Sequence, residues 1–577
     1  MIFDSLTIAG SSLKAHQKAM DVVSHNIANV NTPGYSRQTS TLVTEVPEKI
    51  GLLNLGRGVD VQSIQRNVAP LIDTGLRNNS AQSEFYSTLS SGLAAVENVF
   101  GSLESTGLAA GLDDFFLAWQ SLANNPQDQG QQFNVRSKSE SLTFTLSNMH
   151  QQLSDAQVNA NAEIDQHIHQ ANLLLSEIAS LSMQIQRQEN ASTGKAGMAN
   201  DLHDKRDQAV RDLSALIPVQ QVATNDGGLL LQTVGGDLLV QDGVARTLAR
   251  SSSAGSTGFS EIVVAGTSTP VAGLDQGGKI GGLIELRDNK FGDYMASVDS
   301  IAANLIFAVN QVHASGVGSG RVSSLTSGQG ILNPALAIDD VAHRNAFTGQ
   351  IQSGSFSLHV YDNVGNPLTP GGTLINITAG VTTMNDVAAA ISAVAGVTAS
   401  VDTAGRLVVD AGSNTLGFSD DSSNFLAAYE INALFHGQGA GSITLSDAVK
   451  ADASLISTGQ VDAVSSVILP GDNTSALAIM AIQNTPLSID GSVPSSLHDR
   501  TSVLSSRYGT DVAVADQQRV YRDAEAESLQ QQRQAISGVN IDEELVEMIK
   551  FQRAYEASAK VIQTTNAMLD SLLGLIR

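Results

Sequence analysis

The sequence has no cysteine, which excludes disulfides, thiolate metal sites and cysteine nucleophiles. Aromatic residues make up only 4% of the 577 residues, with a single Trp, so the cores must be built from Leu, Val, Ile and Ala. Lys and Arg number 32 against 57 Asp and Glu, which gives a formal net charge of −25. This charge argues against nucleic acid or an anionic membrane as the main partner.

Two further features are missing from the chain. No apolar run reaches the length of a membrane span. The first residues do not form a signal peptide, because Asp4 interrupts them and no basic region precedes an apolar block. We therefore expect a protein that is either cytosolic or leaves the cell without a cleaved signal, and its length suggests about three or four domains.

Both ends of the chain carry an apolar stripe that advances in alternating steps of three and four residues, the heptad period of helices that pack side by side. The N-terminal stripe consists of Ile2, Leu6, Ala9, Leu13, His16, Met20, Val23, Ile27 and Val30. The C-terminal stripe consists of Ile541, Leu545, Met548, Gln552, Tyr555, Ala559, Ile562, Asn566, Leu569, Leu573 and Ile576. The period predicts an assembly device, although the period alone is also compatible with the closure of one monomer's two ends on each other.

Three members of these stripes are polar: His16, Gln552 and Asn566. Polar residues at core positions of a coiled coil fix its register and weaken wrong pairings. The C-terminal helix is expected to begin after Asn540 as the cap, with Glu543 completing a capping box. Acidic residues in that first turn also suit the positive end of the helix dipole.

The region between the stripes predicts helices first and strands later. Apolar faces at helical spacing run to about residue 216, and a Gly-Gly turn at Gly235-Gly236 marks a hairpin. A helix returns over 283–312, residues 352–412 alternate as a small α+β module, and helices resume from Ser475.

The expected fold is therefore multidomain α and β, with paired terminal coiled-coil helices, a long helical domain, and β-rich and α+β modules inserted in the middle. The expected domains are 1–50 with 535–577 (terminal coiled coil), 51–220 with 281–325 and 440–534 (helical rod), 221–280 with 326–350 (β-rich), and 351–439 (small α+β).

Several residue groups could suggest a catalytic or metal site, and each has a simpler explanation. His167 and His169 face away from each other on a helix, so a solvated face is the better interpretation. The Gly-rich segment 437–441 lacks the strand and helix that flank a phosphate loop. The adjacent pairs Asp339-Asp340 and Asp420-Asp421 could hold a cation, although such pairs in an acidic chain are usually just solvated. We predict no catalytic residues, no metal and no cofactor.

Two segments resemble signatures of the bacterial flagellar axial proteins. His25-Asn26-Ile27-Ala28-Asn29-Val30-Asn31-Thr32-Pro33-Gly34-Tyr35-Ser36-Arg37-Gln38 is similar to the family's N-terminal Ala-Asn-x-x-Thr-Pro-Gly-Tyr motif. Residues 537–544 with 550–560 resemble its C-terminal signature. Within this family, residues 56–66, 281–289 and 471–478 look most like the hook-associated proteins of the FlgK type.

The resemblance implies a structural subunit rather than an enzyme. Such proteins are exported unfolded through the flagellar type III apparatus with a cytosolic export chaperone, and they assemble as a ring between hook and filament. The implied partners are hook protein, a second junction protein on the filament side, and copies of the chain itself. The implied location is the extracellular flagellum.

The resemblance places the assembly interface on the two ends of the chain. The N-terminal helix and turn contribute Leu6, Leu13, Met20, Val23, Ile27, Asn29, Thr32, Pro33, Gly34 and Tyr35. The C-terminal helix, which would also bind the chaperone, contributes Ile541, Leu545, Met548, Gln552, Tyr555, Ala559, Ile562, Leu569, Leu573 and Ile576.

Two alternatives remain open. The chain could be another axial subunit, such as a hook or distal-rod protein, because these share both terminal signatures. It could instead be a surface adhesin or hydrolase carried on a helical stalk. That second alternative needs a convergent set of catalytic or metal-binding side chains within 221–450, and the sequence offers none.

Overall fold

The computed structural model describes residues 2–50, 53–101, 107–191, 199–223, 229–255, 258–462 and 464–575. The chain divides into two compact units. The first unit contains residues 1–92, 160–286 and 513–577, and the second contains residues 93–159 and 287–512. The long helices α5 (Gln129–Ala191) and α13 (Leu497–Ser537) contribute residues to both units.

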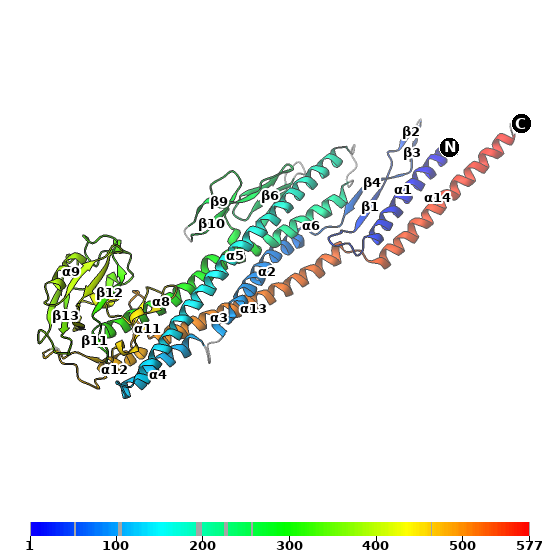
Figure 1. Cartoon of the computed structure of the whole chain (residues 1–577). Helices are drawn as coiled ribbons and strands as arrows, with labels where there is room; N and C mark the ends of the chain where they lie inside the picture. The colour runs from blue at the N-terminus through cyan, green and yellow to red at the C-terminus, as the bar shows by residue number, and fades with distance from the viewer. Residues whose placement is uncertain are drawn as a thin grey trace. The chain divides into compact units, whose positions relative to one another are not determined.

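The first unit is mainly helical, with two small β regions. Its terminal helices α1 and α14 lie side by side, and the β1–β4 hairpin covers another side of α1 (Figure 1). Its other helical elements are α2 (Pro70–Ala95), α6 (Asn200–Leu216), η1 (Leu274–Gln276) and α7 (Gly278–Ile284), and the terminal pair is α1 (Ile2–Ala28) and α14 (Ile541–Leu575).

The strands of the first unit form antiparallel hairpins. β1 pairs with β4, β2 with β3, β5 to β8 form a four-stranded meander, and β9 pairs with β10. The strands are β1 (Gln38–Thr44), β2 (Glu48–Ile50), β3 (Leu53–Leu55), β4 (Val59–Arg66), β5 (Val219–Ala223), β6 (Leu229–Thr233), β7 (Leu238–Gln241), β8 (Val244–Ala245), β9 (Leu248–Ala254) and β10 (Ser260–Val264).

The second unit combines a helical core with small sheets. Its helical elements are α3 (Glu97–Gly101), α4 (Leu108–Asn124), α8 (Phe291–Ala314), η3 (Val341–His343), η4 (Thr348–Gln350), α9 (Met384–Ser392), α10 (Phe425–Ala428), α11 (Asp447–Ala451), η5 (Ala453–Leu455), α12 (Thr474–Ala481) and η6 (Ile482–Asn484). A π-helical turn, η2 (Glu285–Lys290), joins α7 to α8.

The strands of the second unit are β11 (Gly316–Val317), β12 (Ser324–Gly330), β13 (Gly354–Tyr361), β14 (Thr373–Ile377), β15 (Thr398–Val401), β16 (Arg406–Asp410), β17 (Thr415–Ser419), β18 (Phe435–His436), β19 (Thr444–Leu445) and β20 (Gly459–Gln460). They form two three-stranded sheets, ordered β14-β13-β17 and β12-β16-β15, and two two-stranded pairs, β11-β20 and β18-β19.

The structure confirms most of the predicted elements. The apolar face of α4 (Leu112, Phe115, Phe116, Trp119 and Leu122) is buried. The Gly-Gly turn joins β6 to β7, and Gly236 adopts the positive φ that such a turn requires. The fold class is confirmed as multidomain α and β with paired terminal helices.

Two predictions from the sequence are corrected by the structure, one about a domain boundary and one about apolar stretches. Residues 326–350 were grouped with 221–280, but β12 pairs with β16 and lies in the second unit, because its backbone hydrogen bonds go to the α+β module. The continuous helical stretch Gly278–Ala314 is also long and apolar enough to cross a membrane, where none was expected. It packs as a core helix, with 61% of its most apolar window buried inside the fold.

Glu430 is a buried carboxyl in the second unit, only 1% exposed. Its Oε1 accepts hydrogen bonds from Gln329 Nε2 at 2.6 Å and from Gly437 N at 2.9 Å. Its Oε2 finds no hydrogen-bond donor among the described residues. Burial raises the pKa of Glu430 to about 7, although those two hydrogen bonds act in the opposite direction.

This raised pKa predicts how pH affects the stability of the second unit. Between about pH 4.5 and 7 the folded chain keeps a proton on Glu430 that the unfolded chain releases, so the free energy of unfolding falls as pH rises through that window. The total loss is roughly 3 kcal/mol. We expect Glu430→Gln to flatten this slope and to stabilise the unit at pH 8 but not at pH 4.5.

Urea unfolding followed by the fluorescence of Trp119, the single Trp, reports on this unit. Glu527→Gln, an exposed carboxyl in the first unit, serves as the control and should leave the slope unchanged. An equal slope in wild type and Glu430→Gln would show that another group causes the pH dependence.

Candidate functional site: the junction of the two chain termini

The helices α1 and α14 pack against each other with a heptad repeat of contacts. On α14 the positions nearest α1 follow one another at seven-residue intervals, with half-buried Phe551 between buried residues Glu544, Ser558 and Thr565. His16 of α1 lies against Phe551, with ring centroids 6.1 Å apart. The pair is therefore a short coiled coil within one chain.

Polar groups form layers within this helix pair. The hydroxyls of Ser12 and Ser558 are 2.8 Å apart, and Asn26 Nδ2 donates to Glu544 Oε2 at 2.8 Å. Asn26 and Glu544 are each only 1% exposed. Buried polar groups that satisfy each other in this way favour one register of the helices over its neighbours.

Asn26 also holds the chain that follows α1. Its Nδ2 donates to Gln38 O at 2.8 Å, and its Oδ1 accepts from Gln38 N at 2.9 Å and from Tyr35 OH at 2.8 Å. With the bond to Glu544, the amide makes all four hydrogen bonds of which it is capable. Asn26 thus connects α1, the Pro-Gly turn, β1 and α14.

Arg37 makes the second connection to the C-terminal segment. Its Nε donates to Glu544 Oε1 at 2.6 Å, and its backbone N–H donates to Ser537 O at 2.9 Å. Its Nη1 also lies 3.4 Å from the exposed carboxylate of Glu543. Glu543 therefore faces Arg37, while Asn540 caps α14 by accepting from Asp542 N at 3.0 Å.

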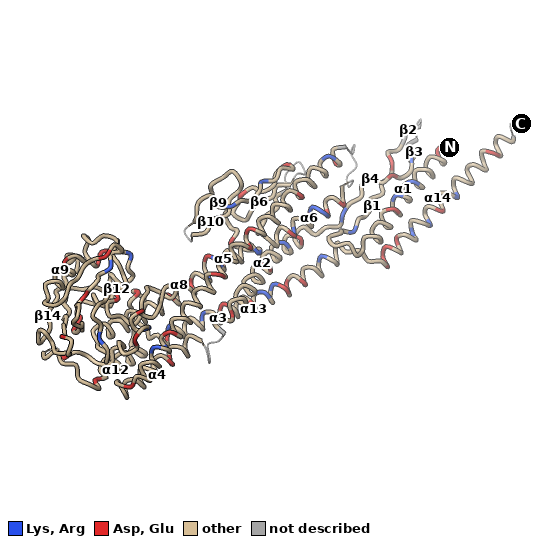
Figure 2. Tube along the Cα trace, in the orientation of Figure 1, with Lys and Arg blue, Asp and Glu red and all other residues tan. Residues whose placement is uncertain are grey.

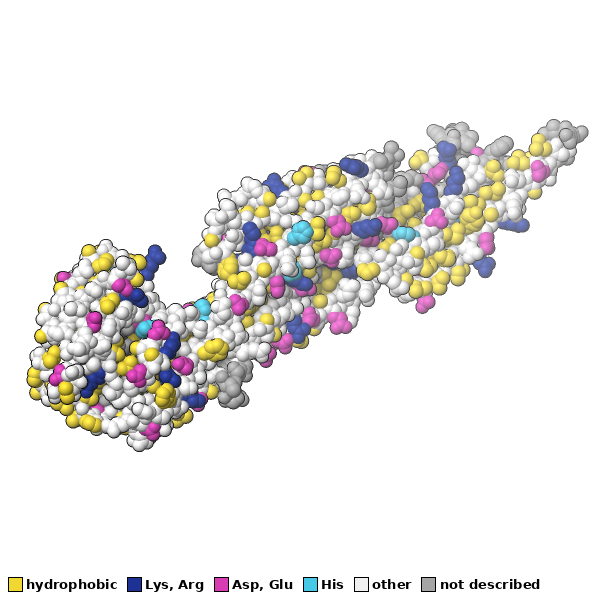
Figure 3. Space-filling model, viewed as in Figure 1, with side chains coloured by type: hydrophobic (Ala, Val, Ile, Leu, Met, Phe, Trp, Pro, Cys, Tyr) yellow, Lys and Arg dark blue, Asp and Glu magenta, His cyan; other side chains and the backbone are white. Residues whose placement is uncertain are grey.

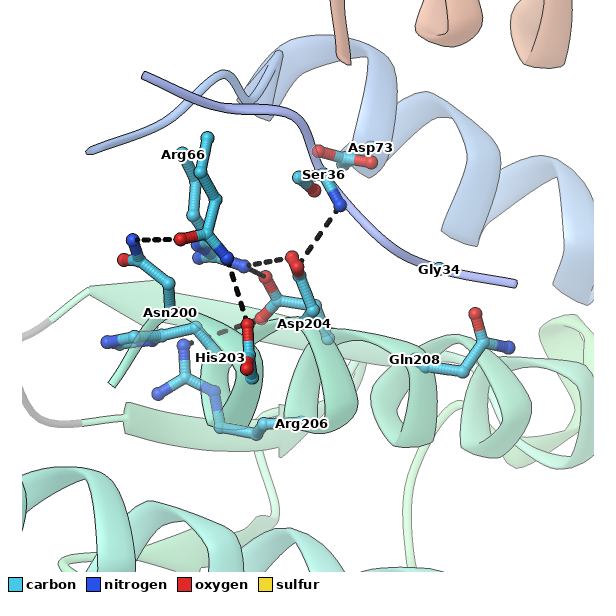
Figure 4. Close-up of polar contacts among 12 residues, drawn as sticks. Gly34, Ser36, Arg66, Asp73, Asn200, His203, Asp204, Arg206 and Gln208 are labelled. Carbon is cyan, nitrogen blue, oxygen red and sulfur yellow. Dashed lines mark hydrogen bonds and ion pairs between the residues drawn. The ribbon is translucent and has the colours of Figure 1, made fainter. Parts of the chain in front are cut away.

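The same segment docks on α6 (Figure 4). Ser36 N donates to Asp204 Oδ2 at 3.1 Å, and Gln38 Nε2 donates to Asp201 Oδ1 at 2.9 Å. Arg66, at the end of β4, donates to Asp204 Oδ1 at 2.8 Å. Burial raises the pKa of Asp204, while the bonds from Arg66 and Ser36 act to lower it.

Two arginines from other helices secure the turn itself. Arg533 of α13 donates to Gly34 O at 3.2 Å and to Asp73 Oδ1 of α2 at 3.1 Å. Arg211 of α6 lies 3.8 Å from the same carboxylate. Tyr35 packs edge-on against His25, and burial raises the pKa of its hydroxyl. The turn is thus held by α1, α6 and α13 together.

Gly34 adopts φ +83°, and an added Cβ would lie 2.9 Å from Gln208 Oε1 and 3.1 Å from Arg211 Nη2. We expect Gly34→Ala to destabilise the turn by roughly 1–2 kcal/mol, through backbone strain and this crowding. The loss should appear as faster amide hydrogen exchange in residues 34–38. Gly574→Ala, where an added Cβ meets nothing within 4 Å and φ lies outside the left-handed region, serves as the control. Equal exchange in both variants would contradict the strained geometry.

The predicted interface residues of α1 and its turn differ in exposure. Val23 is buried, Thr32 and Pro33 are exposed, and the half-buried members are Leu6, Leu13, Met20, Ile27, Asn29, Gly34 and Tyr35. The residues that contact α14 include Ser12, His16 and Asn26. Small residues such as Ala15 and Ala19 are almost fully buried, because α1 lies between α14 and the β1–β4 hairpin.

The predicted stripe on α14 has two positions in each heptad. The position that includes Met548, Tyr555 and Ile562 faces α1. At the other position, the residues that contact α1 come one residue before the predicted ones, as Ser558 does before Ala559. Met548, Tyr555, Ala559, Ile562 and Leu569 are half-buried. Ile541, Leu545, Gln552 and Leu573 are exposed, while Ile576 lies outside the described residues.

The expected polar seam also changes. Gln552 and Asn566 are exposed, so of the three expected polar positions only His16 lies in the helix pair. Ser12–Ser558 and Asn26–Glu544 take their place. Asn26, Arg37 and Glu544 lie within the two signatures, where Asn26 and Arg37 were assigned no role and Glu544 was expected only to complement the helix dipole. The signal that could have found Asn26 and Glu544 is that each is a polar residue within a signature and one residue from the apolar stripe, whereas Arg37 lies beyond the stripe and carries no such signal.

The acidic pairs considered as cation sites accept hydrogen bonds from other groups of the chain, Asp420 from the hydroxyl of Ser419 at 2.8 Å and the other three from backbone N–H groups. Asp340 Oδ1 accepts from Ala342 N at 2.8 Å, and Asp339 accepts from Gly380 N. Asp421 accepts from Leu426 N at 2.9 Å. Among the described residues, no group of three or more His, Asp or Glu is arranged to hold a metal ion.

The chain is similar to known flagellar proteins. The model described as "Flagellar hook-associated protein FlgK helical domain" matches residues 93–324. Flagellar hook-associated protein 1 of Salmonella typhimurium is 27% identical over 98% of this chain and 99% of its own length. The Escherichia coli protein of the same name is 28% identical over 98% of each chain. Residues 93–324 are thus similar to the FlgK helical domain, and the chain as a whole is similar to flagellar hook-associated protein 1.

Further matches cover other parts of the chain. Models described as flagellar basal body rod protein match residues 6–35 and, for the FlgEFG C-terminal region, 530–575. The "Flagellin hook IN motif" matches residues 355–413. A solved structure of FlgK from Burkholderia pseudomallei is 17% identical, covers 80% of this chain and all of its own, and gives a TM-score of 0.49.

Proposed function

We propose that this chain is a structural subunit of the bacterial flagellum that forms the junction between hook and filament. The observation that carries the proposal is the meeting of the two terminal signatures. Asn26 and Arg37 of the first bind Glu544 of the second, about five hundred residues away in sequence. The name of the relatives, hook-associated protein 1, supports the same role.

The family models help to distinguish this role from that of other axial subunits. The models that match the two ends are described for basal body rod proteins, so the ends are a feature that several axial proteins share. The model that matches 93–324 is described for FlgK alone. The internal region therefore favours a hook-associated subunit over a hook or rod protein.

The assembly interface is proposed to include the side of α14 that α1 leaves open. A two-stranded pair covers only part of this helix, and large apolar side chains remain exposed along it (Figure 3). Contiguous exposed apolar surface marks a site of protein association. The exposed residues are Ile541, Leu545, Val546, Ile549, Val561, Met568, Leu572 and Leu573.

The proposed partners follow from this surface and from the family. Copies of the chain, hook protein and a second junction protein on the filament side would cover the terminal helices in the assembled flagellum. A cytosolic export chaperone would cover α14 before export through the type III apparatus. The protein is proposed to reach the extracellular flagellum without a cleaved signal peptide.

The experiment is to locate an epitope-tagged full-length chain on sheared flagella. We expect a single narrow band at the hook end of each filament. Label spread along the filament, or confined to the hook or rod, would contradict the junction role. Removing residues 541–577 should leave the second unit folded, as reported by Trp119 fluorescence, but should abolish the band.

A further inference from the structure

A cavity of about 280 Å³ lies in the first unit, beside the junction described above. Its wall is formed by the end of β4, by the first turns of α2, and by residues of α6 and β5. Its charged lining consists of Arg66, Arg77, Arg206, Asp73 and Asp207. Three guanidinium groups thus face two carboxylates, in a chain whose net charge is −25.

Both carboxylates are already engaged by arginines. Asp207 Oδ2 lies 3.0 Å from Arg66 Nη1, and its Oδ1 lies 3.4 Å from Arg206 Nη2. Asp73 Oδ1 lies 3.1 Å from Arg533 Nε and 3.8 Å from Arg211 Nη1, neither of which lines the cavity. Among the described residues, neither carboxylate forms a hydrogen bond or ion pair with Arg77, the third arginine of the wall.

The remaining guanidinium donors are only partly used. Arg206 is 7% exposed, and its Nε has no acceptor among the described residues. Arg77 donates from Nη2 to the hydroxyl of Thr74 at 2.9 Å. Burial lowers the pKa of Arg77, although Asp73 and Asp207 act to raise it. Buried donors without acceptors are uncommon in folded proteins and need an explanation.

The backbone adds to the positive character of the cavity. Pro70 begins α2 and lines the wall, so the N-terminal end of a 26-residue helix faces this site. Helix N-termini carry partial positive charge and favour anions. Guanidinium groups, with their planar forks of donors, match the geometry of carboxylate and phosphate oxygens.

We propose that this cavity binds one oxyanion of the carboxylate or phosphate class, with Arg77 and Arg206 as its principal donors. Its oxygens supply acceptors for the unused donors of these two arginines. The oxyanion could be a free ion, or it could be the side-chain carboxylate of a neighbouring copy in the assembled flagellum. Only the second source rests on the proposed function.

The first experimental arm tests the isolated full-length chain. Inorganic phosphate and acetate are titrated at constant ionic strength against chloride, and binding is followed by calorimetry. We expect saturable one-site binding of at least one of the two anions if the source is a free ion. Arg77→Gln should then weaken the affinity about tenfold or more, because it removes a charged hydrogen-bond donor.

Two variants keep this arm interpretable. Arg77→Lys keeps the charge and should restore part of the affinity. Arg519→Gln removes a half-buried arginine of α13 whose ion-pair partners among the described residues are Asp516 and Asp523 of its own helix, and it should leave binding unchanged. Equal loss in Arg77→Gln and Arg519→Gln would overturn the proposal, since binding would then reflect net charge alone.

The second arm measures incorporation of the same variants into flagella. A neighbouring carboxylate as the source predicts no binding in the first arm and a several-fold loss of incorporation for Arg77→Gln, with Arg77→Lys partly restored. No binding together with normal incorporation of Arg77→Gln would overturn the proposal. Absence of the wild-type chain from the hook end would instead contradict the proposed function. The anion titrations of the first arm would then be the test of the oxyanion site.

Discussion

Replacing Glu544 with alanine is expected to loosen the junction between the chain's two ends by roughly 3 kcal/mol. Glu544 is 1% exposed and accepts from Asn26 at 2.8 Å and from Arg37 at 2.6 Å. Its removal leaves the amide of Asn26 and the guanidinium of Arg37 without their buried acceptor, which costs more than the loss of the bonds alone.

Amide hydrogen exchange of α1 and α14 measures this loss, because it reports local opening in a chain that has more than one cooperative unit. Glu544→Gln keeps the shape and one acceptor, so the expected loss is smaller, roughly 1 kcal/mol. The neighbouring Glu543→Gln changes a carboxylate that is 60% exposed and should shift exchange by less than about 0.5 kcal/mol. Equal effects at positions 543 and 544 would contradict the assignment of Glu544 as the buried connector.

The helices were predictable because their signal is local. Apolar residues at helical spacing define α4 and α5, and the predicted apolar positions in both helices, from Leu112 to Ile185, are buried. Charged residues of both signs occur along the long helices (Figure 2). Turn chemistry identified the β6–β7 hairpin for the same reason.

The register of the terminal helix pair was only half predictable. A stripe shows that a helix has an apolar side, but the stripe on α14 is wider than the surface that α1 covers. Met548, Tyr555 and Ile562 belong to both the predicted and the observed faces. The other face position is Ser558 rather than the predicted Ala559, because hydrogen bonding to Ser12 and not hydrophobicity selects it.

The polar junction itself lay beyond sequence reasoning. Its contacts join residues more than five hundred positions apart, as in Asn26–Glu544 and Arg37–Glu543. Periodicity carries no information about such distant pairs. The strand β12 was misplaced for a related reason, because the partner of a strand depends on tertiary packing and not on its own sequence.

The exposed side of α14 leads to the second large effect. Leu545→Glu is expected to leave the isolated chain intact while reducing its incorporation into flagella to about a tenth or less. Leu545 is 45% exposed in the single chain, so its replacement should change stability by less than about 0.5 kcal/mol. In an apolar interface between subunits the new carboxylate would be buried without a partner, which costs several kcal/mol, and each 1.4 kcal/mol is about a tenfold change.

Two measurements separate these effects: hydrogen exchange of α1 and α14 in the purified chain, and the amount of tagged chain at the hook end of sheared flagella. Val341→Glu is the matched control, because it places the same charge at a residue that is 84% exposed in the second unit. It should incorporate normally. Normal incorporation of Leu545→Glu would remove this side of α14 from the interface, whereas unchanged exchange with failed incorporation would assign Leu545 to contact between subunits.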